Sequence, residues 1–205
     1  MFEIAFKTEL GILVADKLLT EQLLAEIRSN YSRAGRYYHT LTHLDNLLAE
    51  LLPIKNNIDD WQTLIFSIAY HDIVYNSRKQ DNEEKSAAFA YERMTRLGLP
   101  GIVKAKCSSQ IKATKGHQVS SDNDTNYFID ADLAILGSGD ESYKEYAKQI
   151  RREYRIYPDF LYKPGRQKVL RHFLAMENIY KTSWFKEKYE EQARRNMTNE
   201  LNSLL

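Results

Sequence analysis

The sequence predicts an all-α fold, a single-domain bundle of helices. Only four prolines and eight glycines occur among 205 residues, so few positions interrupt a helix. Apolar residues recur mostly three and four positions apart, which is the period of an amphipathic helix. With 43% apolar residues, a chain of this length can bury one substantial core, and its length alone does not demand two domains.

Charge and cysteine content narrow the class of protein. The chain carries 29 basic and 28 acidic residues, a net charge of +1, so it lacks the field of a dedicated nucleic-acid binder, although a local basic pocket stays open. Cys107 is the only cysteine, which excludes an internal disulfide and fits a reducing compartment. The amino terminus does not resemble a secretory signal, and no apolar run would span a bilayer. These features predict a cytoplasmic protein.

Apolar stripes define the first helices. Residues 20–32 are predicted to form a helix capped by Thr20, and residues 41–52 a second helix with His43 at the edge of its apolar face. Asp59 and Asp60 then favour the start of a buried helix, because negative charge stabilises a helix amino terminus. The inward side chains of these three helices are Leu23, Leu24, Ile27, Leu44, Leu47, Leu48, Leu51, Trp61, Leu64, Ile65 and Ile68.

The His71-Asp72 pair is expected late in that buried helix, and turn signals divide the middle of the chain. Asn82 is predicted to cap a helix that ends before Gly98-Leu99-Pro100, and another helix runs to about Thr114. Residues 115–126 are polar and turn-rich, so they predict a long loop.

The carboxyl-terminal part begins with an apolar segment, residues 127–137, that contains Asp130 and Asp132. Helices are then predicted at residues 141–154, at residues 165–180 after Pro164, and from Trp184 to the end.

Histidine and aspartate in apolar surroundings form a candidate metal site. The buried-looking members are His43, His71, Asp72 and either Asp130 or Asp132. Imidazole nitrogen and carboxylate oxygen together suit a divalent first-row metal such as Mn, Fe, Co, Ni or Zn. Taken singly, a buried histidine is more often a hydrogen-bonded core residue. The ordered set on a helical chain is what favours a metal.

That order, His43, then His71-Asp72, then Asp132, resembles the HD superfamily of metal-dependent phosphohydrolases, whose motif is H…HD…D on a helical bundle of the phosphodiesterase-like type. The resemblance runs from about Arg36 to the carboxyl end and is similar to a bacterial subgroup of predicted HD phosphohydrolases. The segments that carry it are Tyr38-His39-Thr40-Leu41-Thr42-His43-Leu44, His71-Asp72-Ile73-Val74-Tyr75, Asp81-Asn82-Glu83-Glu84-Lys85-Ser86-Ala87, Asp130-Ala131-Asp132-Leu133, Ile150-Arg151-Arg152-Glu153-Tyr154, Gly165-Arg166 and Ala193-Arg194-Arg195-Asn196.

The resemblance implies one HD-type domain over residues 1–205, with a helical extension at 1–35, the metal-site core at 36–137 and helices that complete the bundle at 138–205. It implies a divalent ion (Mn, Fe, Co, Ni, Zn or Mg) held by His43, His71, Asp72 and Asp132. Asp132 is preferred to Asp130 because Ala131-Asp132-Leu133 matches the family's last motif, and Asp130 would then support a ligand or cap a helix.

The resemblance further implies hydrolysis of a small phosphate ester or nucleotide by metal-activated water. Glu83 or Glu84 would act as base or position the water, or would simply favour a helix start. His39 would touch phosphate, orient a ligand or donate a structural hydrogen bond, and His117 would serve a second metal, protonate the leaving group or be an ordinary surface histidine. The cationic candidates for binding phosphate are Arg36, Lys85, Arg151, Arg152 and Arg166.

One departure bears on the substrate. In the alarmone-hydrolysing branch of the superfamily an acidic pair follows the His-Asp motif, whereas Tyr75-Asn76 stands here. Nucleoside monophosphates, cyclic dinucleotides and small phosphate esters all stay open as substrates, and so does a homo-oligomer. Two other classes also stay open: a non-catalytic, metal-stabilised helical module that binds a phosphorylated ligand, and a helical interaction protein with hydrogen-bonded core histidines.

Overall fold

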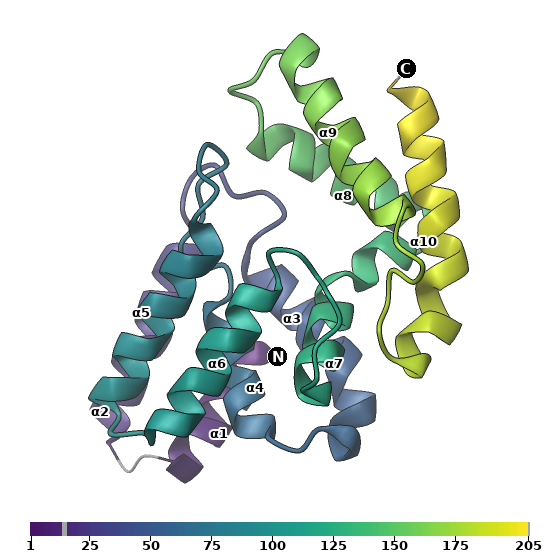
Figure 1. Ribbon diagram of the computed structural model, residues 1–205. Coiled ribbons are helices and arrows are strands. Elements are labelled where there is room, and N and C mark those ends of the chain that lie inside the picture. Colours follow the sequence, from purple (N-terminus) through teal and green to yellow (C-terminus); the bar gives the residue numbers. More distant parts are fainter. Residues whose placement is uncertain (14–15, 205) are drawn as a thin grey trace. The chain divides into compact units, whose positions relative to one another are not determined.

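The computed structural model describes residues 1–13 and 16–204 (Figure 1). Within these residues the chain forms ten α-helices and two short 3-10 helices and contains no strand, which confirms the predicted all-α fold. Predictions that fall on Val14, Ala15 and Leu205 lie outside the described residues. The helices are α1 Phe2–Leu13, α2 Lys17–Tyr31, α3 Leu41–Leu51, η1 Leu52–Asn57, α4 Trp61–Tyr70, α5 Asn82–Arg96, α6 Gly101–Ala113, α7 Asn123–Asp132, η2 Ala134–Gly137, α8 Asp140–Glu153, α9 Asp159–Leu174 and α10 Ser183–Ser203.

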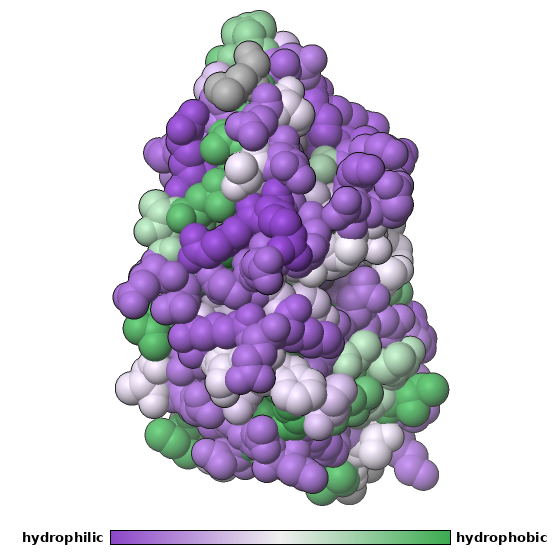
Figure 2. Space-filling view, turned by 90° about the vertical axis from the view of Figure 1, so that its right-hand side faces the viewer, coloured by the Kyte–Doolittle hydropathy of each residue, from purple (hydrophilic) through white to green (hydrophobic). Residues whose placement is uncertain are grey.

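The chain divides into two compact units, Met1–Ile129 and Asp130–Leu205, so that the boundary falls inside α7. The organisation of residues 1–205 as one HD-type domain stays a prediction. No helix in the described part of the chain combines the length and the apolar character needed to span a bilayer. On the face shown in Figure 2, hydrophilic residues predominate and apolar residues lie in small separate patches. This is the pattern expected when amphipathic helices turn their polar sides to water.

Helix α4 is the centre of the first unit. Nine of its ten residues are buried, and it packs against α1, α3, α5 and α6. A helix that is apolar on all sides stays out of water, which is why the stretch from Trp61 to Tyr70 forms the core. Aromatic rings extend this core, since Phe6 of α1 packs on Phe66 and Tyr70 at centroid distances of 5.3 and 6.5 Å. The central helix leads directly into His71 and Asp72.

The amino-terminal caps differ in detail from the predictions. The side chain of Asp16, not Thr20, accepts from the first turn of α2, at Leu19 N, and Thr20 lies one turn inside the helix. At α5 the capping position is Asp81, while Asn82 is the first helical residue. An aspartate and an asparagine or threonine in the same turn offer similar oxygens, so composition alone selects the turn but not the residue.

Helix α4 also ends earlier than predicted. Its last residue is Tyr70, His71 caps its carboxyl end, and Asp72 lies beyond it. Helix α7 starts earlier, at Asn123, because the Asp122 carboxylate accepts from both the main-chain N–H and the hydroxyl of Thr125. The polar loop after α6 therefore ends at residue 122, not at residue 126.

In the second unit α10 packs against η2 and α9. Gly137 of η2 permits a close approach, since a Cβ there would lie 2.5 Å from Cβ of Tyr189. Helix α9 begins at Asp159 and carries Pro164 in its second turn, so the predicted start after Pro164 was wrong. The carbonyl that Pro164 leaves without a helical donor belongs to Phe160, which is exposed and can be hydrated.

Candidate metal centre

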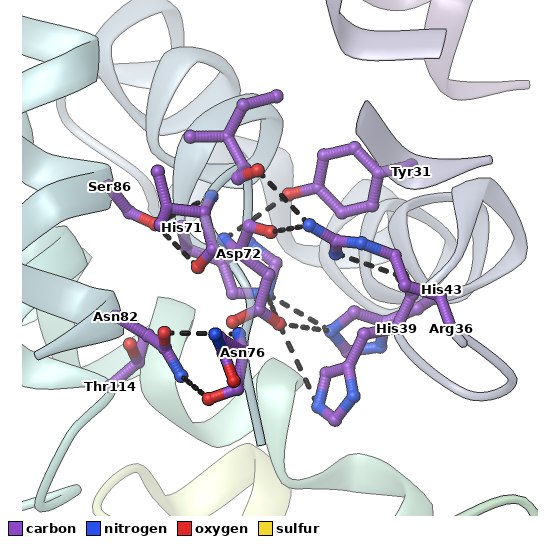
Figure 3. A network of polar contacts seen from close by, with 12 residues as sticks. Tyr31, Arg36, His39, His43, His71, Asp72, Asn76, Asn82, Ser86 and Thr114 are labelled. Atoms are coloured by element: carbon purple, nitrogen blue, oxygen red, sulfur yellow. Dashed lines mark hydrogen bonds and ion pairs between the residues drawn. The ribbon is translucent and has the colours of Figure 1, made fainter. Parts of the chain in front are cut away.

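Two histidines from different helices meet in the first unit. His43 is the third residue of α3 and His71 caps α4, and both side chains are buried. Their Nε2 atoms lie 3.0 Å apart, as Figure 3 shows from close by. The packing of α3 against α4 therefore brings together two ring nitrogens that are 28 residues apart in the sequence.

Asp72 adds a carboxylate to this pair. Its Oδ2 lies 3.1 Å from Nε2 of His71 and 3.9 Å from Nε2 of both His43 and His39. The Asp72 side chain is 16% exposed and that of His39 is 19% exposed, against 3% for His43. The cluster is thus buried at His43 and His71 and partly exposed to solvent at Asp72 and His39, which form its open side.

The hydrogen bonding of His71 decides where its proton lies. Its Nδ1 lies 3.0 Å from the carbonyl oxygen of Ile68, and because a carbonyl only accepts, Nδ1 donates. In a neutral imidazole Nε2 then accepts, and this atom lies 3.0 Å from Nε2 of His43 and 3.1 Å from Oδ2 of Asp72. The three groups can share a proton when one of the imidazoles is charged, and they can equally share a divalent cation.

The spacing fits a metal ion. Imidazole and carboxylate ligands bind divalent first-row metals at roughly 2.0–2.2 Å, so two neighbouring ligand atoms at a right angle stand about 3 Å apart. The 3.0 and 3.1 Å separations among His43, His71 and Asp72 match this value. The hydrogen bond from Nδ1 of His71 to a main-chain carbonyl is also the usual support for an imidazole ligand. The cluster could bind a divalent metal.

Main-chain contacts hold the segment that carries Asp72. The N–H of Asp72 donates to the hydroxyl of Tyr31, at 3.2 Å, and its carbonyl accepts from Arg36, at 2.7 Å. Just beyond, Val74 exchanges hydrogen bonds with the hydroxyl of Ser86 on α5. The supporting roles of Tyr31 and Ser86 were not predicted, because each depends on a partner far away in the sequence.

Aromatic rings surround His39. The ring of Tyr75 lies 4.3 Å from that of His39, and the ring of Tyr38 lies 5.0 Å from it and 4.9 Å from that of His43. Tyr38 and Tyr75 were visible in the sequence as neighbours of the histidine motifs, but periodicity gave no reason to assign them to the site. They make the open side of the cluster aromatic.

Glu83 and Glu84, both in the first turn of α5, differ in their surroundings. Burial raises the pKa of Glu83, and the nearby Asp72 carboxylate raises it further, while main-chain hydrogen bonding opposes this. Glu84 instead forms an ion pair with Lys115 at 2.6 Å, and this hydrogen bond lowers its pKa. Of the two candidate bases, Glu83 is therefore the one whose pKa is raised by Asp72 of the cluster, whereas Glu84 pairs with the exposed Lys115.

Asp130 and Asp132 lie at the end of α7, in the second unit. Asp130 is fully buried and accepts from the N–H groups of Lys181 and Thr182 and from the Thr182 hydroxyl. Burial raises its pKa to about 6, and these hydrogen bonds oppose the shift. Asp130 thus holds the segment that leads into α10, while Asp132, half-buried, is the last residue of α7.

His117 follows α6 and is buried, with a left-handed backbone conformation at φ +48°. Non-glycine residues adopt this conformation uncommonly, and histidine is among the residues that tolerate it better. The nearby Lys115 contacts the main chain of Gln80 as well as Glu84, so the turn after α6 lies beside the start of α5. His117 therefore belongs to a turn whose Lys115 contacts the start of α5, and it is buried, so it is not a surface histidine.

The predicted phosphate-binding cations have varied contacts. Lys85 forms an exposed ion pair with Asp81, and Arg36 is buried beside the cluster. In the second unit, Arg151 pairs with Asp159, Arg152 is exposed on α8, and Arg166 forms a buried two-fold ion pair with Glu200. The guanidinium groups of Arg151 and Arg166 thus form ion pairs that connect α8 with α9 and α9 with α10.

Comparison with models of protein families, with curated proteins and with solved structures found no match. The fold and the cluster define the class on their own: an all-α protein in which two imidazoles and a carboxylate converge on a position that could hold a divalent ion.

Proposed function

We propose that the protein is a metal-dependent phosphohydrolase that acts on a small phosphate ester or a nucleotide. The observation that carries the proposal is the convergence of two imidazole nitrogens and a carboxylate oxygen, from His43, His71 and Asp72, within 3.0 to 3.9 Å of one another. A buried histidine that merely completes a core uses its second nitrogen to satisfy a partner. Here that nitrogen of His71 lies close to two groups of the kind that ligate metals, the His43 imidazole and the Asp72 carboxylate, and a cation would stabilise the three together.

The resemblance to the HD superfamily supports a fourth ligand, Asp132. Phe128 of α7 packs edge-on against the His71 ring, with centroids 5.7 Å apart. Asp132 follows Phe128 by four residues, and side chains at this spacing share one face of a helix. His43 and His71 already supply nitrogens of the kind that could hold an ion. With Asp132 the order H…HD…D is complete.

In the proposed reaction, a bound ion would lower the pKa of a coordinated water and offset charge on a phosphoryl oxygen. The chain's own residues would do the rest. Glu83, whose pKa is raised by burial, would accept the proton of the attacking water. His39, on the open side of the cluster, would donate a hydrogen bond to the phosphate.

A panel of phosphomonoesters and phosphodiesters with added Mn, Co, Ni, Mg or Zn tests this proposal. The central variant is Asp72→Asn, and Asp159→Asn, an exposed carboxylate of the second unit, is the matched control. We expect turnover with metal in the parent and the control, and a loss of about 10²-fold or more in Asp72→Asn with its helical content unchanged. Metal binding without turnover would favour the non-catalytic binding module, and a parent that binds no metal would leave only the hydrogen-bonded core.

The adjacent glutamates give a second, internally matched test. Glu83→Gln should lower kcat by about 10²-fold, because it removes the proposed base. Glu84→Gln, one position away and paired with Lys115, should leave kcat close to that of the parent. Equal effects of the two substitutions would contradict the role assigned to Glu83.

A further inference from the structure

Arg36 lies in the loop between α2 and α3 and is only 9% exposed. Its guanidinium carbon lies 4.8 Å from the ring centroid of Tyr31 and 5.3 Å from that of Tyr75. A permanent charge removed from water needs compensation, and aromatic faces supply part of it. Arg36 is therefore packed like a residue of the protein interior, although it lies in a loop.

Three main-chain carbonyls complete this environment. Nη1 of Arg36 donates to the carbonyl of His39 at 3.1 Å, and Nη2 donates to the carbonyls of Asp72 and Ile73 at 2.7 and 3.1 Å (Figure 3). One guanidinium thus joins the segment that leads into His43 to the segment that follows His71. These are the two segments whose ligand atoms must meet.

Asp72 is held through both of its main-chain polar groups. Its N–H donates to the Tyr31 hydroxyl and its carbonyl accepts from Arg36, while Arg36 in turn packs on the Tyr31 ring. The main chain of Asp72 is therefore fixed before any ion binds, and so is the starting point of its carboxylate. Fixing a ligand in this way raises metal affinity because less freedom is lost on binding.

We propose that Arg36 is a positioning residue that presets the metal-binding geometry of His43, His71 and Asp72, and that it does not bind the phosphate of the substrate. This inference rests on the proposed function, since it assigns the cluster to a metal. Lysine would not replace Arg36, because its ammonium group has no planar face to pack on the two rings and cannot reach the carbonyls of both segments at once.

The test compares Arg36→Lys with Arg33→Lys, an exposed arginine of the same loop. Mn²⁺ affinity is measured by calorimetry, and kcat and KM are measured at saturating Mn²⁺ with p-nitrophenyl phosphate and bis(p-nitrophenyl) phosphate. We expect Arg36→Lys to weaken Mn²⁺ binding about 10- to 100-fold and to lower kcat with little change in KM. Arg33→Lys should match the parent in all three quantities.

A substrate contact would behave differently: Arg36→Lys would keep the Mn²⁺ affinity of the parent and raise KM, and that result would overturn the proposal. Tyr31→Phe is the second variant, because it removes only the acceptor of the Asp72 N–H and keeps the ring under Arg36. We expect it to weaken Mn²⁺ binding in the same direction by a smaller factor. If Arg36→Lys does not fold and Tyr31→Phe binds Mn²⁺ like the parent, the positioning role is refuted.

Direct metal binding separates this inference from the phosphohydrolase proposal. A parent that binds Mn²⁺ but turns over no phosphate ester would remove the proposed hydrolase, while a weakened affinity in Arg36→Lys would still support the positioning role. A parent that binds none of the tested metals would remove both.

Discussion

Asp124 fixes the start of the helix that leads to the cluster, and its removal should destabilise the protein strongly. The carboxylate is 1% exposed and accepts from the N–H groups of Asp59 and Asp60 at 2.8 and 2.9 Å and from Nζ of Lys106 at 2.7 Å. A hydrogen bond to a buried charged group contributes about 1.5–3 kcal/mol. Two such bonds to main-chain groups are lost in Asp124→Ala, and the partly exposed Lys106 can rehydrate. We therefore expect a loss of about 3–6 kcal/mol.

Urea unfolding followed by circular dichroism measures this loss. Asp122→Ala is the matched control, because Asp122 stands at the same end of α7 and near the same lysine but acts mainly as a cap for Thr125. Loss of a cap costs about 1 kcal/mol. If Asp124→Ala is no more destabilising than Asp122→Ala, the hydrogen bonds to the start of α4 do not contribute as argued.

Other perturbations test further contacts of the two units. Gly137→Ala should destabilise the second unit by about 1–3 kcal/mol, since its Cβ would meet Tyr189 at 2.5 Å, and an unchanged melting temperature would show that η2 can shift away. In His117→Gly the freedom of glycine at φ +48° offsets only part of the stability lost with a buried side chain, and kcat should fall if His117 protonates the leaving group, which steady-state kinetics would measure. Burial alone would raise the pKa of the Glu200 carboxyl, but the ion pair with Arg166 lowers this pKa below its ordinary value of 4.5. The ion pair therefore stabilises the folded state fully above about pH 4.5, and its contribution is lost as the pH falls through the lower pKa that Glu200 has in the folded state. Unfolding measured against pH should then show a flatter acid limb for Glu200→Gln, and an identical acid limb would contradict this assignment.

The helices were largely predictable, because their signal is carried by many residues at once. The apolar stripe at Leu44, Leu47, Leu48 and Leu51 indicated α3 and its buried face, and all four residues are buried. Boundaries were less predictable, since each depends on one side chain. The sequence around Asp122 offers several candidate caps, and only the geometry shows which one accepts from Thr125.

The cluster was predictable only as a list of residue types in order. His43, His71 and Asp72 were expected to converge because of the family resemblance, and the structure brings their atoms within 3.0 to 3.9 Å. The contacts of Arg36 could not be foreseen, because a buried arginine on main-chain carbonyls leaves no periodic pattern in the sequence. The sequence made Arg36 a candidate for binding phosphate only because an anionic substrate needs cationic partners.

The position of Asp130 also constrains how the protein can be made. Its hydrogen-bond donors, at Lys181 and Thr182, lie about fifty residues further along the chain. A nascent chain that has passed α7 carries a carboxylate with no main-chain donors until those residues leave the ribosome, and domains complete their folding only when such distant partners are present. A product truncated shortly before residue 181 would keep the Asp130 carboxylate in apolar surroundings without these donors. We expect proteases to degrade such a truncated chain, so that it does not accumulate.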